Sequence, residues 1–571
     1  MNYVKRCYLI IWVATLLLSQ ISFAAVIRVP QDQPTIQAGI DAASDGDTVL
    51  VDDGIWTGKG NKVLKFGGKA ISVQSKNGSQ ACIIDCEKRG RGVTFDKGET
   101  NASIFQGFTI RNGLSAGADG DGGAILCTNR SSPSIKNCVF EKNHAGLGGG
   151  IFIFYRSHPL VIDCAFIGNS AQKDGGGIYC QNNCSPSIMN CVFENNFGRY
   201  GGGGISLFLD GHLRLLDCAF IGNSTEGAGG GIQCGGSSIT IFNCLFDGNS
   251  AAGQSGGVGC YWESPEMTII NSSIVNNTSF QGGGVYVERN CTVSVVNSIL
   301  WGNTASNSGD AAYLKGNVTL NLSYCNVENG TSGIYCYGGG TFNWGDGMID
   351  SNPKFVPGPD GNYYLSQIAS GQSSNSPCVD AGSDLAELIC ESFAGTNYCM
   401  NDYTTRTDGV SDSGQVDMGY HNNLDVIEPT PTPTPTSTPI YTPTPEPTPE
   451  CDYLGSRLVI SQEDPFRAGD TFWLECHVCN NTDAPMREIA TAVLLGVYGE
   501  FWFWPGWTQN FEVEYHHYEP GLTEIQVLEP FIWPHVEGHA EGLEFYSGLI
   551  NAEMTDLIGD FGYLTFGYTD R

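Results

Sequence analysis

A short pattern recurs along the middle of the chain and constrains the fold more than any other feature. Each copy consists of Asn or Asp followed by the frame Cys-x-Phe-x-x-Asn, and copies begin every 26 to 28 residues between positions 137 and 297. In the last two copies Ser replaces Cys and Ile or Leu replaces Phe, and every copy except the last is followed by a block of glycines. A chain that repeats at this interval builds one structural unit per repeat and stacks the units into a solenoid.

Comparing the copies position by position indicates how each coil is built. The Cys and Phe positions are two residues apart, so they lie on one face of an extended strand and are expected to point into the core. The final Asn is invariant, and amides stacked at a strand spacing of about 4.8 Å both donate and accept hydrogen bonds along the stack. The predicted ladders are the Cys column Cys138, Cys164, Cys191, Cys218 and Cys244, and the Asn column Asn143, Asn169, Asn196, Asn223, Asn249, Asn277 and Asn303.

The residues between the ladder positions predict the rest of the coil. The Asn or Asp that opens each copy indicates a recurrent corner, because these residues tolerate left-handed backbone. The intervening segments have no apolar spacing of 3.6 residues, and they contain short β-type runs between Gly and Asn turns. A coil with three short strands satisfies this pattern, since each strand pairs with its equivalent in the next coil. We therefore predict an all-β, single-stranded parallel β-helix of about 10 to 11 coils.

Segments of different composition follow one another along the chain. Lys5 and Arg6 precede an apolar stretch that ends in small residues, which is typical of an export signal. The acidic C-terminal region has short alternating runs bounded by Pro, Gly and Asn, with a possible helix near 551–558. The predicted domains are a signal peptide (1–24), a β-helix with an N-terminal capping helix (25–350), an irregular C-terminal cap (351–427), a Pro/Thr-rich linker (428–450) and an acidic, Trp-rich, β-sandwich-like domain (451–571).

The composition narrows the range of partners. The chain has 28 Lys and Arg against 60 Asp and Glu, so its formal net charge is -32 and nucleic acid is excluded as a partner. No segment after the signal approaches 18 apolar residues, and no transmembrane segment is expected after signal cleavage. Export permits disulfides. We expect reduced thiols in the ladders, because neighbouring coils hold them slightly too far apart for bridging. The candidate disulfides lie elsewhere, at Cys82/Cys86, among Cys378, Cys390 and Cys399, and among Cys451, Cys476 and Cys479.

Three segments carry a resemblance to known families. The segment from Val29 to Val49 resembles the start of the pectin-lyase-like right-handed β-helices. The Gly-Gly-x-Ile and Phe-x-x-Asn motifs are similar to the repeat of the polymorphic outer membrane proteins. The segments 376–382 and 416–420 look like the closing part of bacterial secreted β-helix repeat proteins. The resemblance implies a right-handed β-helix in a bacterial secreted or surface protein, and it includes no catalytic motif of a pectin esterase, polygalacturonase or pectate lyase.

The turns that leave the glycine-flanked strands differ most between coils and carry aromatic and polar side chains. Equivalent turns two coils apart place these side chains on one face of the solenoid. Sugar rings stack on aromatic faces, and polar neighbours bind their hydroxyls. We predict a substrate-binding strip there, with ordinary variation of surface loops as the alternative. Its residues are Tyr155, Arg156, His158, Asp210, His212, Tyr261, Trp262 and Glu263.

Carboxylates provide two further candidates. Calcium prefers hard oxygen ligands, and it is the one cofactor that the sequence suggests. The candidate calcium ligands are Asp408, Asp412 and Asp417, and separately Asp119 and Asp121. Glu141, Glu194 and Asp247 share one column in alternate coils, about 9.6 Å apart, which is the outer limit for an inverting glycosidase pair. Duplication of a two-coil unit explains this spacing without catalysis.

These features favour a secreted or cell-surface protein that binds polysaccharide or a cell-surface glycan, or acts in adhesion, without an evident catalytic constellation. A polysaccharide lyase or glycoside hydrolase on the same fold is the first alternative, and a structural envelope protein is the second. The fold alone does not decide between them. A lyase needs calcium-binding carboxylates beside an Arg or Lys base, and the sequence displays no such cluster, so catalysis is not expected.

Overall fold

The computed structural model describes residues 24–115, 121–262, 266–359 and 361–423, and it also describes the strands between 455 and 569. The chain divides into two compact units, 1–432 and 433–571. The predicted export signal up to residue 23, the Pro/Thr-rich linker and the possible helix near 551–558 lie outside the described residues.

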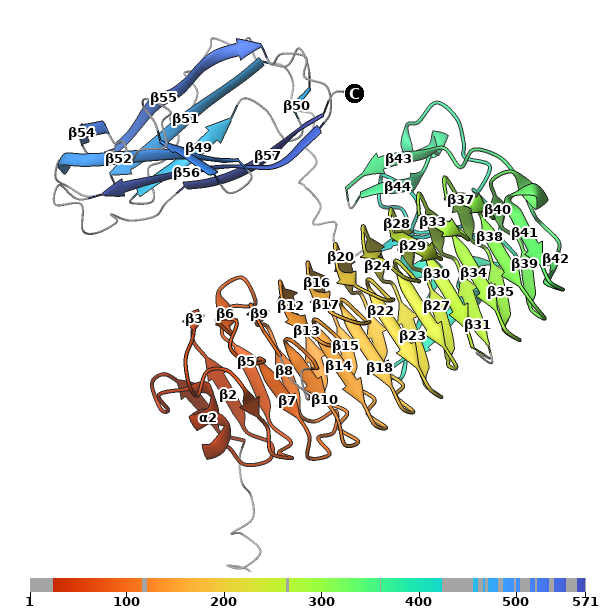
Figure 1. The fold of residues 1–571 in the computed structure, drawn as a ribbon, viewed down its shortest axis with the longest axis horizontal. Coiled ribbons are helices and arrows are strands. Elements are labelled where there is room, and N and C mark those ends of the chain that lie inside the picture. Colours follow the sequence, from red (N-terminus) through yellow and green to blue (C-terminus); the bar gives the residue numbers. More distant parts are fainter. Residues whose placement is uncertain are drawn as a thin grey trace, which may run out of the picture. The chain divides into compact units, whose positions relative to one another are not determined.

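The first unit is a parallel β-solenoid, as predicted (Figure 1). Each central coil passes through four parallel sheets, which we number in the order in which the chain meets them. Sheet 1 consists of β1 (Val26–Val29), β2 (Thr48–Val51), β5 (Ser72–Ser75), β8 (Ile104–Gln106), β11 (Ser134–Lys136), β15 (Leu160–Ile162), β19 (Ser187–Met189), β23 (His212–Leu216), β27 (Ser238–Phe242), β31 (Met267–Ile270), β35 (Thr292–Val296), β39 (Thr319–Ser323) and β42 (Thr341–Trp344). Sheet 2 consists of β3 (Gly54–Trp56), β6 (Cys82–Asp85), β9 (Thr109–Arg111), β12 (Val139–Glu141), β16 (Ala165–Ile167), β20 (Val192–Glu194), β24 (Ala219–Ile221), β28 (Leu245–Asp247), β32 (Ser273–Val275), β36 (Ile299–Trp301) and β40 (Asn326–Val327).

The other two sheets complete the coil. Sheet 3 consists of β13 (His144–Ala145), β17 (Ser170–Ala171), β21 (Phe197–Gly198), β25 (Ser224–Thr225), β29 (Ser250–Gln254), β33 (Thr278–Gln281) and β37 (Thr304–Ser308). Sheet 4 consists of β4 (Leu64–Lys65), β7 (Val93–Phe95), β10 (Ile125–Cys127), β14 (Ile151–Phe154), β18 (Ile178–Gln181), β22 (Ile205–Phe208), β26 (Ile232–Gly235), β30 (Val258–Tyr261), β34 (Val285–Glu288), β38 (Ala312–Lys315) and β41 (Ile334–Tyr337). Three strands per coil were expected. Sheet 3 is the addition, and its first strands have only two residues, too few to show an alternating pattern.

The corner between sheets 1 and 2 has the left-handed backbone that its Asn and Asp residues predict. All seven corner residues have φ between 45° and 56°. The Phe column is buried behind this corner, and Phe193 stacks on Phe166 and on Phe220 with ring centroids 4.6 Å apart in both pairs. Stacking of identical rings at the coil spacing therefore fills this part of the core.

The Asn column forms the predicted ladder of hydrogen bonds between sheets 2 and 3. Asn223 is typical: its Nδ2 donates to Oδ1 of Asn249 at 2.9 Å and to the carbonyl of Phe193 at 2.8 Å. Its Oδ1 accepts from the main-chain N–H and from Nδ2 of Asn196, at 3.0 and 2.9 Å. Every polar atom of the amide is thus satisfied inside the protein, and the side chain is fully buried. This explains why no other residue occupies the column.

The Cys column is a weaker ladder of the same kind. The main-chain N–H of Cys164 donates to Sγ of Cys191 at 3.4 Å, and that of Cys244 donates to Oγ of Ser272 at 3.1 Å. The thiol of Cys138 donates to the carbonyl two residues before it at 3.1 Å, and burial raises its pKa well above the usual range. The described ladder cysteines are free and buried. Ser can replace Cys here because both side chains donate and accept in the same way.

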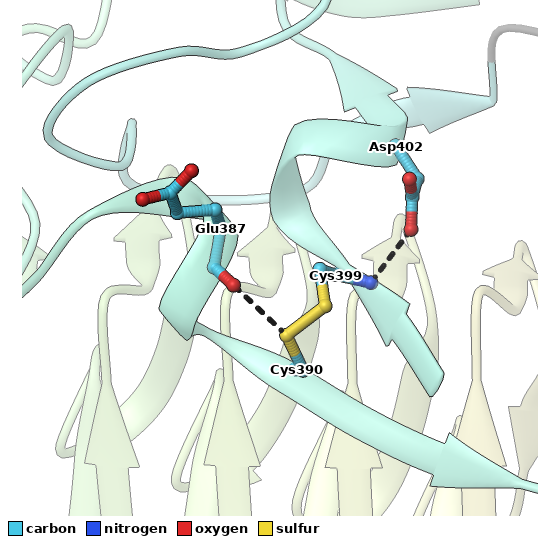
Figure 2. Close-up of a disulfide and its surroundings, with 4 residues drawn as sticks. All are labelled: Glu387, Cys390, Cys399 and Asp402. Carbon is cyan, nitrogen blue, oxygen red and sulfur yellow. Dashed lines mark hydrogen bonds between the residues drawn. A yellow bond between two sulfur atoms is a disulfide. The ribbon is translucent and has the colours of Figure 1, made fainter. Parts of the chain in front are cut away.

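The disulfide predictions have different outcomes. Cys82 and Cys86 are both buried and free, so that prediction is wrong. Cys82 opens the extended strand β6, and four residues of extended chain separate the two Cα atoms by roughly 13 Å, beyond the reach of a disulfide. Cys390 and Cys399 do form a disulfide, which joins directly opposed residues of a hairpin (Figure 2). The N–H of Cys399 also donates to the carboxylate of Asp402 at 2.9 Å.

A short helix precedes the first full coil. Helix α2 (Ile36–Ala42) begins after Thr35, whose hydroxyl accepts from the N–H of Ala38 at 3.2 Å as an N-cap. Ile36 and Ile40 of the helix are buried in the solenoid core. The helix contacts β1 and β2 and therefore buries apolar side chains at the N-terminal end of the stack, where Figure 1 shows it beside β2.

The segment after β42 was expected to close the C-terminal end of the solenoid, and the structure places part of it elsewhere. In the described part of the chain no strand pairs with the outer edge of β41 or β42. Residues 378–423, which we call the strap, instead run along the corner between sheets 1 and 2. The N–H of His421 donates to Oδ1 of Asn243 at 2.7 Å, and Nδ2 of Asn271 donates to the carbonyl of Asp417 at 3.0 Å. The elements of this region are η1 (Gly330–Gly333), β43 (Phe355–Gly358), β44 (Gly361–Leu365), η2 (Ile368–Ser370), η3 (Ala386–Leu388), β45 (Cys390–Phe393), β46 (Thr396–Cys399), η4 (Met400–Asp402), β47 (Tyr403–Thr404) and β48 (Asn422–Asn423).

Apolar contacts explain the lateral position of the strap. Phe393, Met400 and Tyr403 of the strap form a buried cluster with Leu216 and Phe242 at the ends of β23 and β27. The last outward-facing side chains of these strands are apolar, whereas those before them include His212 and Arg214, and burial of the apolar ends stabilises the docked strap.

The described elements of the second unit are strands of 2 to 12 residues. One sheet contains β49 (Gly455–Ile460), β51 (Thr471–Asn480) and β55 (Gly521–Ile532), paired antiparallel. The other contains β50 (Phe466–Arg467), β57 (Gly562–Thr569), β56 (His539–Ile550), β52 (Met486–Val497) and β53 (Glu500–Phe503), and β54 (Glu514–Tyr518) also pairs with β52. The elements of this unit that the structure describes are all strands, and the packing of the two sheets as a sandwich stays a prediction.

Candidate functional site

The turns from sheet 4 to sheet 1 stack on one another along the solenoid. The N–H of Arg156 donates to the carbonyl of Asn182 at 3.0 Å, and the N–H of Asn183 donates to the carbonyl of Leu209 at 2.8 Å. These hydrogen bonds hold the turns in register, so side chains that leave them are spaced by one coil. In three consecutive coils the turn residues with left-handed backbone are Tyr155 and Arg156, Asn182 and Asn183, and Leu209 and Asp210.

These six residues line a cavity of about 290 Å³, which we call the turn pocket. The guanidinium of Arg156 lies 5.8 Å from the centroid of the Tyr155 ring, in a cation–π contact. Tyr155 is 43% exposed and Leu209 is 48% exposed, so ligand can reach both. The pocket combines an accessible aromatic ring with a guanidinium, a carboxylate and two amides. Such a set can stack on a sugar ring and bind its hydroxyls.

Three of the predicted strip residues, Tyr155, Arg156 and Asp210, therefore come together in the turn pocket. Sequence reasoning missed Asn182 and Asn183, which come from the coil between the two that it compared. The sequence did contain a signal for them, since this pair occupies the turn position equivalent to Tyr155 and Arg156. Polar residues in a turn are common, however, and only the stacking of the turns shows that these two complete a cavity.

A column of aromatic rings continues from the turn pocket along the outer face of sheet 4. Phe152 stacks on Tyr179 with centroids 5.6 Å apart, Tyr179 lies 5.9 Å from Phe208, and Phe208 lies 5.2 Å from Trp262. The last contact spans a coil because Gly235 lies between, where a Cβ atom would come within 2.8 Å of both rings. Trp262 is 46% exposed, whereas the other rings of the column are nearly buried.

The structure places Tyr261 in the core of a second aromatic column. Its ring covers Gly259, and it stacks on Tyr286 with centroids 5.4 Å apart. Tyr261 is only 4% exposed, so it packs under the surface and does not offer a face to a ligand. Of the predicted loop, Trp262 is the exposed aromatic residue, and Glu263 lies outside the described residues.

The two histidines of the predicted strip lie beyond the turn pocket, toward sheet 1. The N–H of Ser185 donates to Nδ1 of His158 at 3.0 Å, and the N–H of His212 donates to the hydroxyl of Ser185 at 3.2 Å. Burial lowers the pKa of both imidazoles. Both rings are therefore neutral at pH 7 and can act as hydrogen-bond partners without adding charge.

The column of alternating carboxylates forms as expected on sheet 2. Glu141 pairs in register with Ile167, and Ile167 pairs with Glu194. The carboxylates are thus separated by apolar side chains in the intervening coils. Nδ2 of Asn276 donates to the carboxylate of Asp247 at 3.0 Å. The contacts of these carboxylates are structural, and none of the described residues in this column forms a close acid pair.

The candidate calcium ligands do not converge on one cation. Asp408 is bound by Arg406 at 2.6 Å, and the carboxylate of Asp412 contacts Nε2 of His421 at 2.9 Å. Asp417 accepts from Nε2 of Gln367 at 3.2 Å and from the main-chain N–H of Asp380 at 2.7 Å. Among the described residues, no group of His, Cys, Asp or Glu has the arrangement of a metal site. Asp119 lies outside these residues, and Asp121 accepts from the N–H of Leu147 at 3.1 Å.

The buried Asp412–His421 pair makes docking of the strap sensitive to pH. Burial lowers the pKa of His421, but the bond to Asp412 and the nearby Asp417 outweigh this effect, and the pKa of His421 is raised. Burial and the charge of Asp412 raise the pKa of Asp417 to about 6. Both groups hold a proton more tightly in the docked state, so docking is favoured at low pH. The contribution of Asp417 is lost as the pH rises from about 4 to about 6, and that of His421 is lost as the pH rises above about 6.5.

We expect the amides of residues 416–423 to exchange hydrogen faster at pH 8 than at pH 5.5, after correction for the intrinsic pH dependence of exchange. The measurement is hydrogen exchange by mass spectrometry on the full chain. His421→Gln keeps a hydrogen-bond donor for Asp412 but removes the titration, so its corrected rates are expected to change less with pH. Equal pH dependence in the variant and the natural protein would contradict the assignment to His421.

The fold and the site define the class of the protein: a right-handed parallel β-solenoid that presents polar and aromatic side chains on its stacked turns. A family model described as the right handed beta helix region matches residues 49–246 and 200–345, and the chain belongs to this family. The predicted right-handed β-helix is thereby confirmed. No curated protein matches the sequence. Within the part of the chain that the structure describes, no helix is long and apolar enough to cross a membrane.

Proposed function

We propose that this protein is an exported polysaccharide-binding protein whose turn pocket and Trp262 hold an extended glycan. The observation that carries the proposal is the turn pocket itself, where the exposed ring of Tyr155 stands beside Arg156, Asp210 and two Asn side chains. Aromatic rings with adjacent polar groups are the surface that carbohydrates require, because the ring face packs on C–H groups and the polar groups bind hydroxyls.

The spacing of the exposed aromatic residues favours a polymer over a single sugar. Tyr155 and Trp262 occupy equivalent turns four coils apart, which at the strand spacing corresponds to roughly 19 Å along the solenoid. A ligand that contacts both rings must be extended over that length. The coils between them are rigid, since their turns are joined by main-chain hydrogen bonds. Little ordering cost is therefore incurred on the protein side when a glycan binds.

The test is to replace both exposed rings and to measure binding of the full chain to a panel of polysaccharides. Each ring that stacks on a sugar contributes about 0.5 to 1.5 kcal/mol, so Tyr155→Ala and Trp262→Ala are each expected to weaken binding roughly twofold to tenfold. The dissociation constant of the double variant is expected to rise by the product of the two single increases. Affinity gel electrophoresis or isothermal titration calorimetry with the best polysaccharide of the panel measures the dissociation constants.

Tyr200→Ala is the matched control. Tyr200 is 58% exposed and also contacts a guanidinium, that of Arg199, but it lies outside the turn pocket and the aromatic column. Its replacement is expected to leave binding unchanged. Equal losses in the control and in the pocket variants would refute the proposed surface. An increase in reducing ends or in unsaturated products during incubation would show instead that the protein is a hydrolase or a lyase.

Export is part of the proposal and rests on the N-terminal segment, in which Lys5 and Arg6 precede an apolar stretch and a run of small residues. Expression of the full chain in a bacterial host followed by fractionation tests it. We expect mature protein outside the cytoplasm with an N-terminus near residue 25. Uncleaved protein that stays in the cytoplasm would contradict export.

A further inference from the structure

Positive charge gathers in one part of this acidic protein. The chain as a whole has a net charge of -32, but residues 59–97 contain nine Lys or Arg and three Asp or Glu. Lys65, Lys88, Arg89 and Arg91 line a cavity of about 610 Å³ in the first coils, which we call the basic pocket. A local excess of this kind on an acidic chain creates a positive potential that acts within about 8 Å at physiological ionic strength.

The basic pocket lies on the outer face of sheet 4, at the end nearest helix α2. Lys65 of β4 pairs in register with Thr94 of β7, and Thr94 pairs with Leu126 of β10. The next residue of this column is Phe152, which is nearly buried in the coils where sheet 3 is present. Sheet 3 begins only at β13, so in the first coils the connections from sheet 2 to sheet 4, which contain Lys88, Arg89 and Arg91, line the basic pocket.

Asp96 also lines the basic pocket, so its four cations and one carboxylate leave a net charge of +3, whereas the nearby Glu87 and Asp85 have cationic partners. The carboxylate of Glu87 binds the ammonium of Lys62 at 2.5 Å, and that of Asp85 binds the guanidinium of Arg111 at 3.0 Å. Among the described residues, Lys65, Lys88 and Arg89 form no ion pair within 4 Å. These three cations therefore keep their charge available for a ligand.

Arg91 supplies an oriented donor to the same cavity. One of its terminal nitrogens donates to the hydroxyl of Ser115 at 2.9 Å and to the main-chain carbonyl of Asp121 at 2.8 Å. Both acceptors are neutral groups that hold the guanidinium in place. Arg side chains fixed in this way bind carboxylate and sulfate with directed hydrogen bonds.

We propose that the basic pocket binds an anionic sugar, with its carboxylate or sulfate group held by Arg89, Arg91 and the two lysines. The volume suits one or two sugar units, and the Leu126 side chain provides an apolar surface for a ring face beside the Thr94 hydroxyl. Carboxylate and sulfate share this recognition chemistry, so the test contains one arm for each. The basic pocket is separate from the turn pocket, and its ligand does not depend on the function proposed for the latter.

The test measures binding of the full chain to three short oligosaccharides by calorimetry at 0.05 and 0.3 M salt. The ligands are tetragalacturonate, a sulfated chondroitin tetrasaccharide and neutral maltotetraose. We expect at least one anionic ligand to bind and its affinity to fall several-fold at the higher salt. Lys65→Ser combined with Arg89→Ser is expected to weaken that binding at least tenfold, since each charge-assisted hydrogen bond contributes more than a neutral one.

The matched control is Lys97→Ser combined with Lys173→Ser, which removes the same charge from two exposed side chains outside the basic pocket. The affinity of this control variant for the anionic ligand is expected to stay within twofold of that of the natural protein. Absence of binding in both anionic arms, or binding that does not respond to salt, would overturn the proposal even if the pocket variant failed to fold. Equal weakening in the control would also overturn it. The Tyr155→Ala and Trp262→Ala variants are expected to keep this binding. The two proposed sites are therefore tested independently of each other.

Discussion

Replacing Asn223 by alanine is expected to lower the free energy of unfolding of the solenoid by roughly 3 to 5 kcal/mol. The change removes two hydrogen bonds that the amide donates, to Asn249 and to the carbonyl of Phe193, and two that it accepts from Asn196. These partners are buried in the coil and have no water to replace the lost amide. The loss is therefore larger than that of an ordinary exposed hydrogen bond.

Guanidinium denaturation of the full chain, followed by circular dichroism, measures this effect. Hydrogen exchange by mass spectrometry locates it, because stability in a solenoid is a sum over neighbouring coils. Asn101→Ala is the control: Asn101 is exposed, and its replacement is expected to change stability by no more than about 0.5 kcal/mol. If the two variants unfolded at the same denaturant concentration, the ladder would have no special role in stability.

Replacing Gly203 by alanine is expected to destabilise the solenoid by roughly 3 kcal/mol, at the upper end of overpacking effects. Gly203 belongs to the glycine block between sheets 3 and 4. A Cβ atom at this position would lie 2.5 Å from the carbonyl oxygen of Gly230 and 2.6 Å from the main-chain nitrogen of Ser224. Both are backbone atoms of the next coil, so relief of the clash requires the coils to separate and their hydrogen bonds to lengthen.

Gly316→Ala separates this effect from simple backbone strain. Gly316 has φ of +81° but no atom within 4 Å of an added Cβ, so alanine there costs only the left-handed conformation, about 1 to 2 kcal/mol. Thermal and guanidinium midpoints of the two variants give the comparison. A larger loss of stability in Gly316→Ala than in Gly203→Ala would show that the blocks need glycine for its backbone conformation. Close approach of the coils would then have little effect.

Much of the fold could be predicted because the repeat supplies an internal comparison. The invariant Asn column, with Asn223 as its typical member, identified a ladder, since an amide that stacks on itself tolerates no other side chain. The alternation of the Cys and Phe positions identified the inward face of sheet 2, because strands have a period of two. Sheet 3 was not predicted, because strands of two residues, such as His144 and Ala145, are too short to show an alternating pattern.

The candidate sites were less predictable because they depend on contacts between coils. Tyr155, Arg156 and Asp210 were found from the variability of their turns, but Tyr261, which was predicted for the same strip, is buried under its neighbours. Whether an aromatic residue next to glycine is buried depends on the direction in which its side chain points, and a sequence pattern does not give that direction. The basic pocket was missed although its Lys and Arg residues are close in sequence, because charge clusters are common on surfaces that bind nothing.

The sequence by itself determined the solenoid, its coil length, the inward columns and the Asn ladder, because each of these repeats with the chain and so satisfies the same local chemistry in every coil. Only the tertiary structure decided where the non-repeating parts lie. The strap covers the corner beside Asn243 and Asn271 because apolar side chains at the outer ends of sheet 1 meet those of the strap. The turn pocket and the basic pocket exist because stacking places side chains from different coils side by side. These contacts join residues that no sequence repeat relates to one another. Burial of apolar surface and interactions of charged groups in the folded protein supply their energy.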